Sequence, residues 1–573
     1  MNNKSGEKIV NKKQSFMAGV FTIIFAQIII KILGLVYRVV ITNIPYFGDE
    51  GNGLYAHGYQ IYMLLLAIAS IGVPSAISKL VSERIAVGKR KEAHYIFKVA
   101  LLLFGMIGFI GSAFLFFSAG FIANKIGNPD IQGIMIVLSP AVFFVAVAAV
   151  IRGYFNGLYN MKVSSNSQVI EQVFKTILTV VLVLVVYYLT IKSPSEIAEK
   201  LNWSESNVTV VMAIVANAAS TIATAIGLLY AILYYQRSKK EIWKEINESK
   251  VEYKKEKMTK VMKTILAISI PISLASIISA INRNIDNFTV VNGLKSVLMG
   301  SFSMVESVVQ SEAERLYGIL SGRVDTLIGL PTALNVAFST ALVPVVSEAM
   351  ANKDLKTAVR RINFSIRTTL LIAFPCAIGM CVLAGPILKL IYPAVPLNEA
   401  ELLLQISSFA IIFTLLNQTV AGALQGLGKV AIPAISLACG ATVKFILNVI
   451  LVRNPAIGIY GAAITSVIAG MVTGMIEITA LHKTIKLNSN FYKTVIKPAI
   501  AVGIMGVVTY FFHIWFETYI RAGSIATIVS ILVAVVVYLL AILELKILDR
   551  DDYHMLPYGD KIYQFLEKIK LVK

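Results

Sequence analysis

A few charged residues stand inside stretches of this sequence that are otherwise apolar, and they are the first candidates for chemistry. Lys31 and Arg38 are seven residues apart, which places them on one face of a helix. Arg283 and Asp286 are one helical turn apart in a second apolar stretch, and Arg323 opens a third. Cations outnumber acids in this set, and both arginine and lysine bind phosphate. We therefore predict that these five residues bind an anionic substrate.

Further charged residues in or beside apolar stretches are secondary candidates. They are Lys79, Arg152, Glu171, Lys175, Asp325 and Lys444. Plainer explanations compete with a binding role. Glu171 and Lys175 are spaced to pair within one helix, and Arg152 stands where a loop anchor would stand. Snorkelling to the membrane surface would explain Arg38, Arg323 and Asp325 equally well.

The apolar stretches around these charges have the length of membrane spans. The chain has 573 residues, 57% of them hydrophobic, and a mean hydropathy of +0.75. A helix needs about twenty apolar residues to cross a bilayer, and it satisfies its own backbone hydrogen bonds there. We therefore expect an all-α polytopic membrane protein. Hydropathy predicts 14 spans: 16–41, 53–80, 95–121, 132–158, 166–190, 207–235, 260–291, 323–349, 362–391, 401–425, 430–452, 458–482, 494–516 and 522–546.

The loops predict the orientation of the chain. Lysine and arginine gather in every second loop, for example in Arg84–Lys91, Gln236–Lys260 and Lys353–Arg361, whereas Tyr392–Ala400 on the opposite side has no cation. By the positive-inside rule, both termini are cytoplasmic and the protein lies in a bacterial cell membrane. The net charge of +20 is spread over these loops. This distribution favours contact with anionic membrane lipids and argues against nucleic acid as a partner.

The sequence also repeats itself. Val81-Ser-Glu recurs as Val346-Ser-Glu after 265 residues, and Gly157 with its surroundings recurs at Gly426 after 269 residues. Each half has six predicted spans, so both halves enter the membrane in the same direction and enclose a cavity between them. The predicted domains are an N-lobe at 1–255, a C-lobe at 256–490, an added pair of spans at 491–548 and an amphipathic cytoplasmic tail at 549–573.

One segment of the second half has no counterpart in the first. Residues 292–322 separate the seventh and eighth spans, and apolar residues alternate there with polar ones as in an amphipathic helix at the membrane surface. The expected polar face contains Glu306, Gln310, Glu312, Glu314 and Arg315. A gate over the cavity and a plain surface helix explain the pattern equally well.

The sequence contains no motif for catalysis or for a cofactor. It has no nucleotide-binding Gly-x-x-x-x-Gly-Lys-Ser/Thr loop and no serine-hydrolase motif, and its histidines and cysteines lack the spacing of metal ligands. We expect a protein that is not an enzyme and has neither metal nor cofactor. Energy for transport would come from an ion gradient or from the membrane potential, which is worth about 2.3 kcal/mol per charge per 100 mV.

Four stretches give the chain a resemblance to a known family. They are the segment from Lys31 to Arg38, the segment from Gly72 to Glu83, Arg152-Gly-Tyr-Phe-Asn-Gly157 with the later Gln168-Val-Ile-Glu171-Gln, and the segment from Gly422 to Gly428. In this order they resemble the polysaccharide-transport branch of the multidrug/oligosaccharidyl-lipid/polysaccharide (MOP) exporter superfamily. Within that branch the likeness is to the group of the stage V sporulation protein B and MurJ-type lipid II flippases.

The resemblance implies a two-lobed flippase that moves undecaprenyl-pyrophosphate-linked sugars to the outer leaflet. It implies that first-span cations act on the substrate, and these match Lys31 and Arg38. Lys31 stands where many relatives have arginine, so the charge is kept without the bidentate fork. Gram-negative relatives have an acid early in the second span, whereas this chain reads Gly53-Leu-Tyr-Ala-His-Gly-Tyr-Gln. The spans at 494–516 and 522–546 would form the family's proposed groove for the lipid tail.

These observations together predict a monomeric flippase that exports an anionic lipid-linked oligosaccharide, lipid II or a related precursor, by alternating access. Two alternatives stay open. A drug/cation antiporter of the same fold would need an unpaired acid in the N-lobe. A non-transporting envelope-assembly protein would flip no lipid in liposomes. A housekeeping role in the cell wall and a role in sporulation are equally open.

Overall fold

The computed structural model describes residues 16–69, 72–192, 205–249, 256–301, 306–485, 492–520 and 523–549, together with 563, 564 and 567. Within these ranges the regular structure is helical and no strand occurs, which confirms the predicted all-α class. The N-terminal lysines and nearly all of the predicted tail at 549–573 lie outside the described residues.

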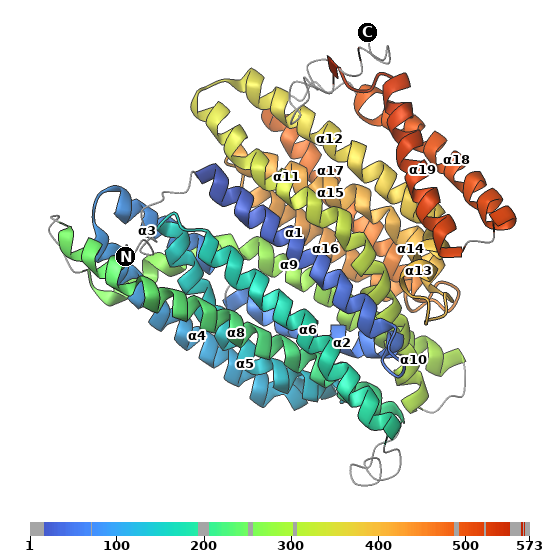
Figure 1. Cartoon of the computed structure of the whole chain (residues 1–573), viewed down its shortest axis with the longest axis horizontal. Coiled ribbons are helices and arrows are strands. Elements are labelled where there is room, and N and C mark those ends of the chain that lie inside the picture. The colour runs from blue at the N-terminus through green and yellow to red at the C-terminus, as the bar shows by residue number, and fades with distance from the viewer. Residues whose placement is uncertain are drawn as a thin grey trace, which may run out of the picture. The chain divides into compact units, whose positions relative to one another are not determined.

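The chain divides into two compact units, Met1–Gly322 and Arg323–Lys573, which we call the first and second units. The first unit contains α1 (Phe16–Thr42), α2 (Gly48–Ala69), α3 (Val73–Ala86), α4 (Arg90–Ile126), α5 (Ile131–Gly157), α6 (Lys162–Lys192), α8 (Glu205–Glu248), α9 (Met258–Ser301) and α10 (Glu306–Gly318) (Figure 1). The π-helix η1 (Ile319–Val324) leads from one unit into the other.

The second unit begins with α11 (Asp325–Ala351) and ends with a helical hairpin. Its elements are α11, α12 (Leu355–Val382), α13 (Ala384–Ile391), α14 (Ala400–Ser408), α15 (Ala410–Gly426), α16 (Ala431–Leu451), α17 (Tyr460–Ile485), the π-helix η2 (Tyr492–Ile496), α18 (Lys497–Ile520) and α19 (Gly523–Glu544). The hairpin consists of α18 and α19, which pack against each other and against α12 and α13.

Eleven helices of the described chain are long and apolar enough to cross a membrane. They carry large apolar side chains on their outer surfaces, such as Phe117 of α4, which is 83% exposed. Lipid solvates such a surface, whereas water does not. The chain is therefore a multi-pass membrane protein. The predicted spans that correspond to α2, α9 and α11 are not among these eleven, so the number of 14 stays a prediction.

Some predicted spans are built from two helices rather than one. The span predicted at 53–80 is divided between α2 and α3, and those at 362–391 and 401–425 are divided in the same way. At the first break, Pro74 occupies the first turn of α3, where its missing N–H is tolerated. The backbone N–H of Gly72 donates to Ser273 Oγ of α9 at 3.0 Å. A Cβ at Gly72 would lie 2.3 Å from that oxygen, so the break lets α9 approach closely.

Helix α9 packs in the first unit, against α2, α3 and α4, although we predicted it as the first span of the C-lobe. Asn284 Nδ2 donates to the carbonyl of Gln60 at 3.0 Å, and Asn287 Nδ2 donates to the carbonyl of His57 at 3.1 Å. These bonds join α9 to α2. The lobe boundary at residue 255 remains a prediction about the repeat, while the packing boundary lies between 322 and 323.

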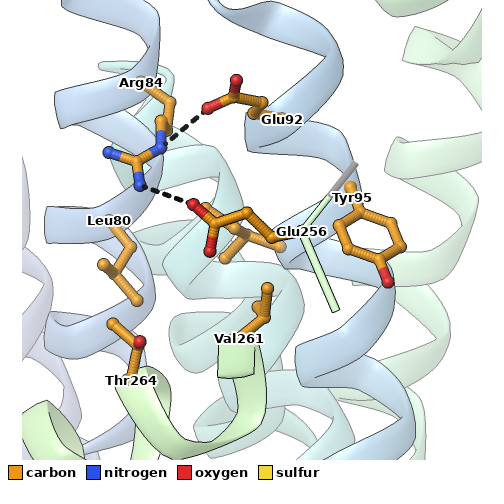
Figure 2. Close-up of a pocket in the computed structure, with 8 residues that line it drawn as sticks. Leu80, Arg84, Glu92, Tyr95, Glu256, Val261 and Thr264 are labelled. Carbon is orange, nitrogen blue, oxygen red and sulfur yellow. Dashed lines mark ion pairs between the residues drawn. The ribbon is translucent and has the colours of Figure 1, made fainter. Parts of the chain in front are cut away.

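An ion-pair group joins the beginning of α9 to α3 and α4. Arg84 Nε lies 3.1 Å from Glu92 Oε2 of α4, and Arg84 Nη2 lies 4.0 Å from an oxygen of Glu256, just before α9. Figure 2 shows the three side chains beside a small pocket lined by Leu80, Tyr95, Val261 and Thr264. All three charged side chains are partly exposed, and exposed ion pairs contribute at most about 1 kcal/mol. These ion pairs therefore orient the beginning of α9 but contribute little to the stability of the fold.

A similar helix–helix interface occurs within each unit, at the positions of the sequence repeat. In the first unit α3 packs on α5, and a Cβ at Gly157 would lie 2.7 Å from the Val81 Cβ. In the second unit α11 packs on α15, and a Cβ at Gly426 would lie 2.8 Å from the Val346 Cβ. Close approach through small residues is how membrane helices associate. The repeated sequence positions therefore make equivalent packing contacts in the two units.

Valine at position 157 or 426 should destabilise the protein, because its side chain has no space against Val81 or Val346. Overpacking of this kind costs about 1–3 kcal/mol. We expect Gly157→Val and Gly426→Val each to lower the thermal midpoint of the detergent-solubilised protein, followed by size-exclusion chromatography after heating. Gly105→Val is the control, since nothing lies within 4 Å of a Cβ at that position of α4. An unchanged midpoint for Gly157→Val would contradict the close interface.

Candidate functional site

Cationic and aromatic side chains from α1, α2 and α6 meet inside the first unit. We call this set the cation–tyrosine cluster: Tyr37 and Arg38 of α1, Tyr55 and Tyr59 of α2, and Lys175 of α6. Tyr55 and Tyr59 are one turn apart on the same face of α2 and stack with ring centroids 5.6 Å apart. The cluster therefore depends on how α1 and α6 are held beside α2.

Polar contacts hold α1 along α6. Gln27 Nε2 donates to Gln168 Oε1 at 2.8 Å, and Thr176 Oγ1 donates to the carbonyl of Leu33 at 3.3 Å. A Cβ at Gly34 would lie 3.8 Å from the side chain of Gln172. These bonds satisfy polar groups that lipid cannot satisfy, so they fix the register of the two helices. In this register Tyr37 faces Lys175.

Lys175 is the most unusual member of the cluster, because it is a cation held only by neutral groups. The residue is 9% exposed, and its Nζ donates to the Tyr59 hydroxyl at 3.3 Å. The same Nζ lies 4.4 Å from the ring centroid of Tyr59 and 5.6 Å from that of Tyr37. In the described part of the chain no carboxylate comes within 4 Å of it. Cation–π contacts offset only part of the cost of burying such a charge.

Arg38 is also oriented by neutral groups. Its Nη1 donates to Asn52 Oδ1 at 2.9 Å, and its Cζ lies 4.5 Å from the ring centroid of Tyr55. Asn52 in turn donates to Thr42 Oγ1 at 2.7 Å, which fixes the amide. The hydroxyls of Tyr37 and Tyr55 lie 3.3 Å apart. The guanidinium is half-buried and keeps donors for a further acceptor, because a guanidinium has five N–H groups.

Glu171 has a different partner from the one that its spacing suggested. Its Oε2 accepts from Arg152 Nη2 at 2.8 Å, and its Oε1 accepts from Thr224 Oγ1 at 3.2 Å. Arg152 also donates from Nε to Ser167 Oγ at 2.8 Å and is only 7% exposed. The predicted pair of Glu171 with Lys175 is therefore not formed, and Arg152 belongs to a buried ion pair rather than to a loop anchor. This pairing leaves the charge of Lys175 uncompensated.

The other predicted residues of the first unit lie on α1, α3 and α9. Lys31 is exposed on α1, and no hydrogen bond or ion pair reaches it from the described residues. Arg283 is exposed on α9, donates to Ser279 Oγ at 3.0 Å and lies within electrostatic reach of Tyr59. Asp286 is half-buried on the next turn, and Lys79 is exposed on α3. The structure thus brings Arg38 and Lys175 together and places Arg283 near their tyrosines.

The remaining predicted residues belong to the second unit. Arg323 is fully buried, and its Nη1 donates to the carbonyl of Pro396 at 2.8 Å while its Cζ lies 6.0 Å from the Tyr392 ring. These contacts tie the start of α11 to the loop before α14. Asp325 is exposed, and Lys444 is buried in α16. A role of these three residues in substrate binding stays a prediction.

Sequence reasoning missed the tyrosines of the cluster, because only charged residues were ranked as candidates. A signal was nevertheless present in the sequence. Tyr55 and Tyr59 stand one turn apart in the predicted second span, and Tyr37 directly precedes Arg38. Aromatic faces at helical spacing, next to a buried cation, are typical of a cation–π arrangement.

A second buried polar group joins α10 to α2. His57 Nδ1 lies 2.9 Å from Glu314 Oε1, with both side chains at most 1% exposed. The same oxygen accepts from Asn128 Nδ2 and, at 3.2 Å, from Gln310 Nε2. In the adjacent turn, burial raises the pKa of Asp130, and the negative charge of Glu314 adds to this rise. A helix is present in the predicted segment, as α10, but Glu314 is buried and does not lie on the expected polar face.

Glycines allow α10 to lie directly on α2. A Cβ at Gly53 would stand 2.1 Å from the carbonyl oxygen of Glu314, and a Cβ at Gly318 would stand 1.7 Å from the carbonyl oxygen of Asp49. Backbones at this distance leave no room for any side chain. α10 is therefore part of the core of the first unit at this end, and it restrains the helix that carries Tyr55 and Tyr59.

The chain belongs to the polysaccharide biosynthesis protein family, whose model matches residues 16–350. The MatE family model matches residues 323–450. Among known proteins, the chain is 26% identical over 560 residues to stage V sporulation protein B of Bacillus subtilis (strain 168), covering 95% of this chain and 98% of that protein. It is also 26% identical over 480 residues to lipid II flippase MurJ of the same organism, covering 81% and 82%.

Solved structures show the same fold. Lipid II flippase MurJ in an inward closed conformation matches with a TM-score of 0.61 and 17% identity, over 92% of this chain and 97% of that one. An inward-facing multidrug resistance MATE family transporter of the MOP superfamily matches with a TM-score of 0.61 and 13% identity, over 82% and 99%. The predicted resemblance to the MOP superfamily and to its sporulation protein B and MurJ group is confirmed.

Removing the Glu314 carboxylate should loosen α10. Glu314→Leu would leave the donors of Asn128 and Gln310 without their acceptor, and each buried unsatisfied group costs about 1–3 kcal/mol. We expect faster amide hydrogen exchange over Glu306–Gly318. Glu312→Leu is the matched control on the same helix, because Glu312 is partly exposed and pairs with Arg315 one turn away. Equal exchange in the two variants would contradict an anchoring role for Glu314.

Proposed function

We propose that this protein is a flippase for an anionic undecaprenyl-pyrophosphate-linked sugar, lipid II or a related precursor. One observation supports the proposal above all others. Arg38 and Lys175 bring two positive charges into a bundle of membrane helices, and neither has a carboxylate partner among the described residues. Such charges are costly unless an anion shares the site. A pyrophosphate would supply that anion and accept charge-assisted hydrogen bonds.

The geometry suggests separate roles for the cations. Lys31 and Arg38 share one face of α1, where Lys31 is exposed and Arg38 is half-buried, so both can reach a phosphate. Arg38 is already oriented by Asn52 and Tyr55, and less entropy is lost when a pre-oriented fork binds. Lys175 lies deeper and adds positive potential beneath the site, where low dielectric strengthens it. Arg283 would add a further cation from α9.

The proposed direction of transport agrees with the available energy. An anion that leaves a cell with a negative interior gains about 2.3 kcal/mol per charge per 100 mV of membrane potential. A flippase of this kind would need no nucleotide and could use the potential or an ion gradient alone. The proposal places both termini in the cytoplasm, in accord with the basic loops. The relative named as lipid II flippase MurJ is matched over 81% of this chain and supports the same class of cargo.

A drug/cation antiporter would need a free acid in the first unit. Two carboxylates of the first unit are already engaged, since Glu171 pairs with Arg152 and Glu314 with His57. The surplus of charge around Tyr59 is positive. The site therefore favours an anionic substrate over a cationic drug.

Removing the charge of Lys175 should slow transport. Lys175→Met keeps the length and apolar packing of the side chain and loses the ammonium. A hydrogen bond to a charged group is worth about 1.5–3 kcal/mol, so we expect at least about a tenfold lower flipping rate of fluorescent lipid II in proteoliposomes. Lys175→Arg should retain more activity. The control is Lys239→Met, at an exposed lysine of α8. A full rate in the doubly substituted Arg38→Gln, Lys175→Met protein would refute the cationic site.

Complementation would test the class of substrate. Cells depleted of their own lipid II flippase should grow when this protein is expressed and should lyse when it carries Arg38→Gln with Lys175→Met. Membrane levels of both forms are compared by immunoblot, so that loss of protein is not mistaken for loss of function. If the protein inserts normally, growth fails and drug efflux rises, the antiporter is the correct function. If neither lipid flipping nor efflux is detected, the envelope-assembly alternative gains support.

A further inference from the structure

A cavity of about 290 Å³ lies in the second unit, where α13 and α14 meet the hairpin of α18 and α19. Its polar lining comes from all four helices. These residues are Lys389, Glu401, His513, Glu517, Ser524 and Thr527. The volume suits a small polar group, since pockets for whole small molecules begin at about 300 Å³. None of these side chains belongs to the cation–tyrosine cluster.

The cavity contains both a cation and an anion that have no partner within the described ranges of the chain. Lys389 is exposed, and no hydrogen bond or ion pair reaches it from the described part of the chain. The same holds for the carboxylate of Glu401. A Cβ at Gly385 would lie 2.8 Å from both Cδ and Oε1 of Glu401, so the carboxylate occupies space that only glycine leaves open. The fold therefore makes room for an acid that no donor among the described residues satisfies.

A second acid is held at the cavity by His513. The imidazole is 7% exposed, and its Nδ1 lies 3.0 Å from Ser530 Oγ. Its Nε2 lies 3.3 Å from Glu517 Oε2, one turn further along α18. Ser530 thus orients the ring, and the ring positions Glu517. Glu517 is itself 54% exposed, so its other oxygen stays accessible to a ligand.

The surroundings of the cavity indicate the membrane surface. Both α18 and α19 belong to the helices that can cross a membrane, and the cavity lies where one ends and the other begins. Trp515 and Tyr519 are exposed on the last turns of α18, and Tyr519 is 75% exposed. Aromatic side chains at the ends of spans are typical of the interface with lipid headgroups. Ile525 and Ile528 continue an exposed apolar surface along α19, where acyl chains would lie.

We propose that this cavity binds the headgroup of a phospholipid that carries a primary amine. Its phosphate would contact Lys389, and its ammonium would donate hydrogen bonds to Glu401 and Glu517. An ammonium has three donors, which two carboxylates can accept. A lipid without an amine would bring its phosphate toward two carboxylates with nothing to offset them. A quaternary amine would have the charge but no N–H to donate.

The lipid, rather than a soluble amine phosphate, is the proposed occupant because the apolar surface of α19 continues from the cavity. A headgroup docked there would tether its acyl chains along the hairpin. The site would then fix one lipid at the end of α18 and α19 without taking part in the binding of the transported substrate.

Native mass spectrometry of the full-length protein can test the assignment. The protein is equilibrated in micelles with equal amounts of phosphatidylethanolamine, phosphatidylglycerol and phosphatidylcholine. We expect phosphatidylethanolamine to be retained in about tenfold preference, the effect of one charge-assisted hydrogen bond. The isosteric Glu401→Gln should bring its retention down to that of phosphatidylcholine. Lys389→Ala should lower the retention of all three lipids. Lys429→Ala, at an exposed lysine of the same unit outside the cavity, is the control.

Two further measurements keep the test decisive. Gly385→Ala keeps every charge of the cavity and pushes the Glu401 carboxylate aside, so it should remove the preference as Glu401→Gln does. Thermal midpoints establish that each variant is folded. Equal retention of the three lipids by the unmodified protein would overturn the proposal. So would an unchanged preference in folded Glu401→Gln protein. Soluble phosphoethanolamine that displaces the lipid at equal concentration would show that the ligand is not a lipid.

Discussion

The cost of a buried charge among membrane helices is the constraint on which the first unit depends. A carboxylate or cation there needs a partner, because lipid offers none. Arg152 and Glu171 satisfy each other at 2.8 Å, and Glu314 is held by His57 and two amides. Lys175 stands apart, since tyrosine rings and one hydroxyl are its only described contacts. The pairs compensate their own charges, whereas no described carboxylate within 4 Å compensates the charge of Lys175.

The two units have the same packing but different charges. Ser167 of α6 and Ser436 of α16 occupy equivalent positions, 269 residues apart, and each hydroxyl donates to the carbonyl three residues earlier. In the first unit Ser167 accepts from Arg152, the partner of Glu171. In the second unit Gly440 replaces that acid, and Glu477 of α17 lies 2.8 Å from the Ser436 hydroxyl instead. The helix framework thus accommodates different buried polar groups, so equivalent positions in the two halves need not share a role.

Hydropathy predicted the helices well, because it depends on whether lipid or water surrounds each residue. Runs of apolar residues located the eleven helices of the described chain that are long and apolar enough to cross a membrane. The glycines of the repeat, in turn, lie in the α3–α5 and α11–α15 interfaces. Side-chain partners were harder to predict. Spacing within one helix suggested a pair of Glu171 with Lys175, whereas the observed partner, Arg152, comes from another helix. The burial of Glu314 depends on the approach of α10 to α2, and no local pattern reports such a distance between helices.

The helix that hydropathy identifies least clearly carries much of the site. α2 falls short of the criterion for a membrane span because polar residues interrupt its sequence. Asn52, one of these polar residues, orients Arg38, while Asn284 and Asn287 of α9 bond to the backbone of α2. A helix with such a face is stable in a membrane only if that face is turned from lipid toward other helices or toward a polar ligand. A weak hydropathy signal between strong ones is therefore informative in its own right. In a transporter it indicates the helices that face the path of the substrate rather than the bilayer.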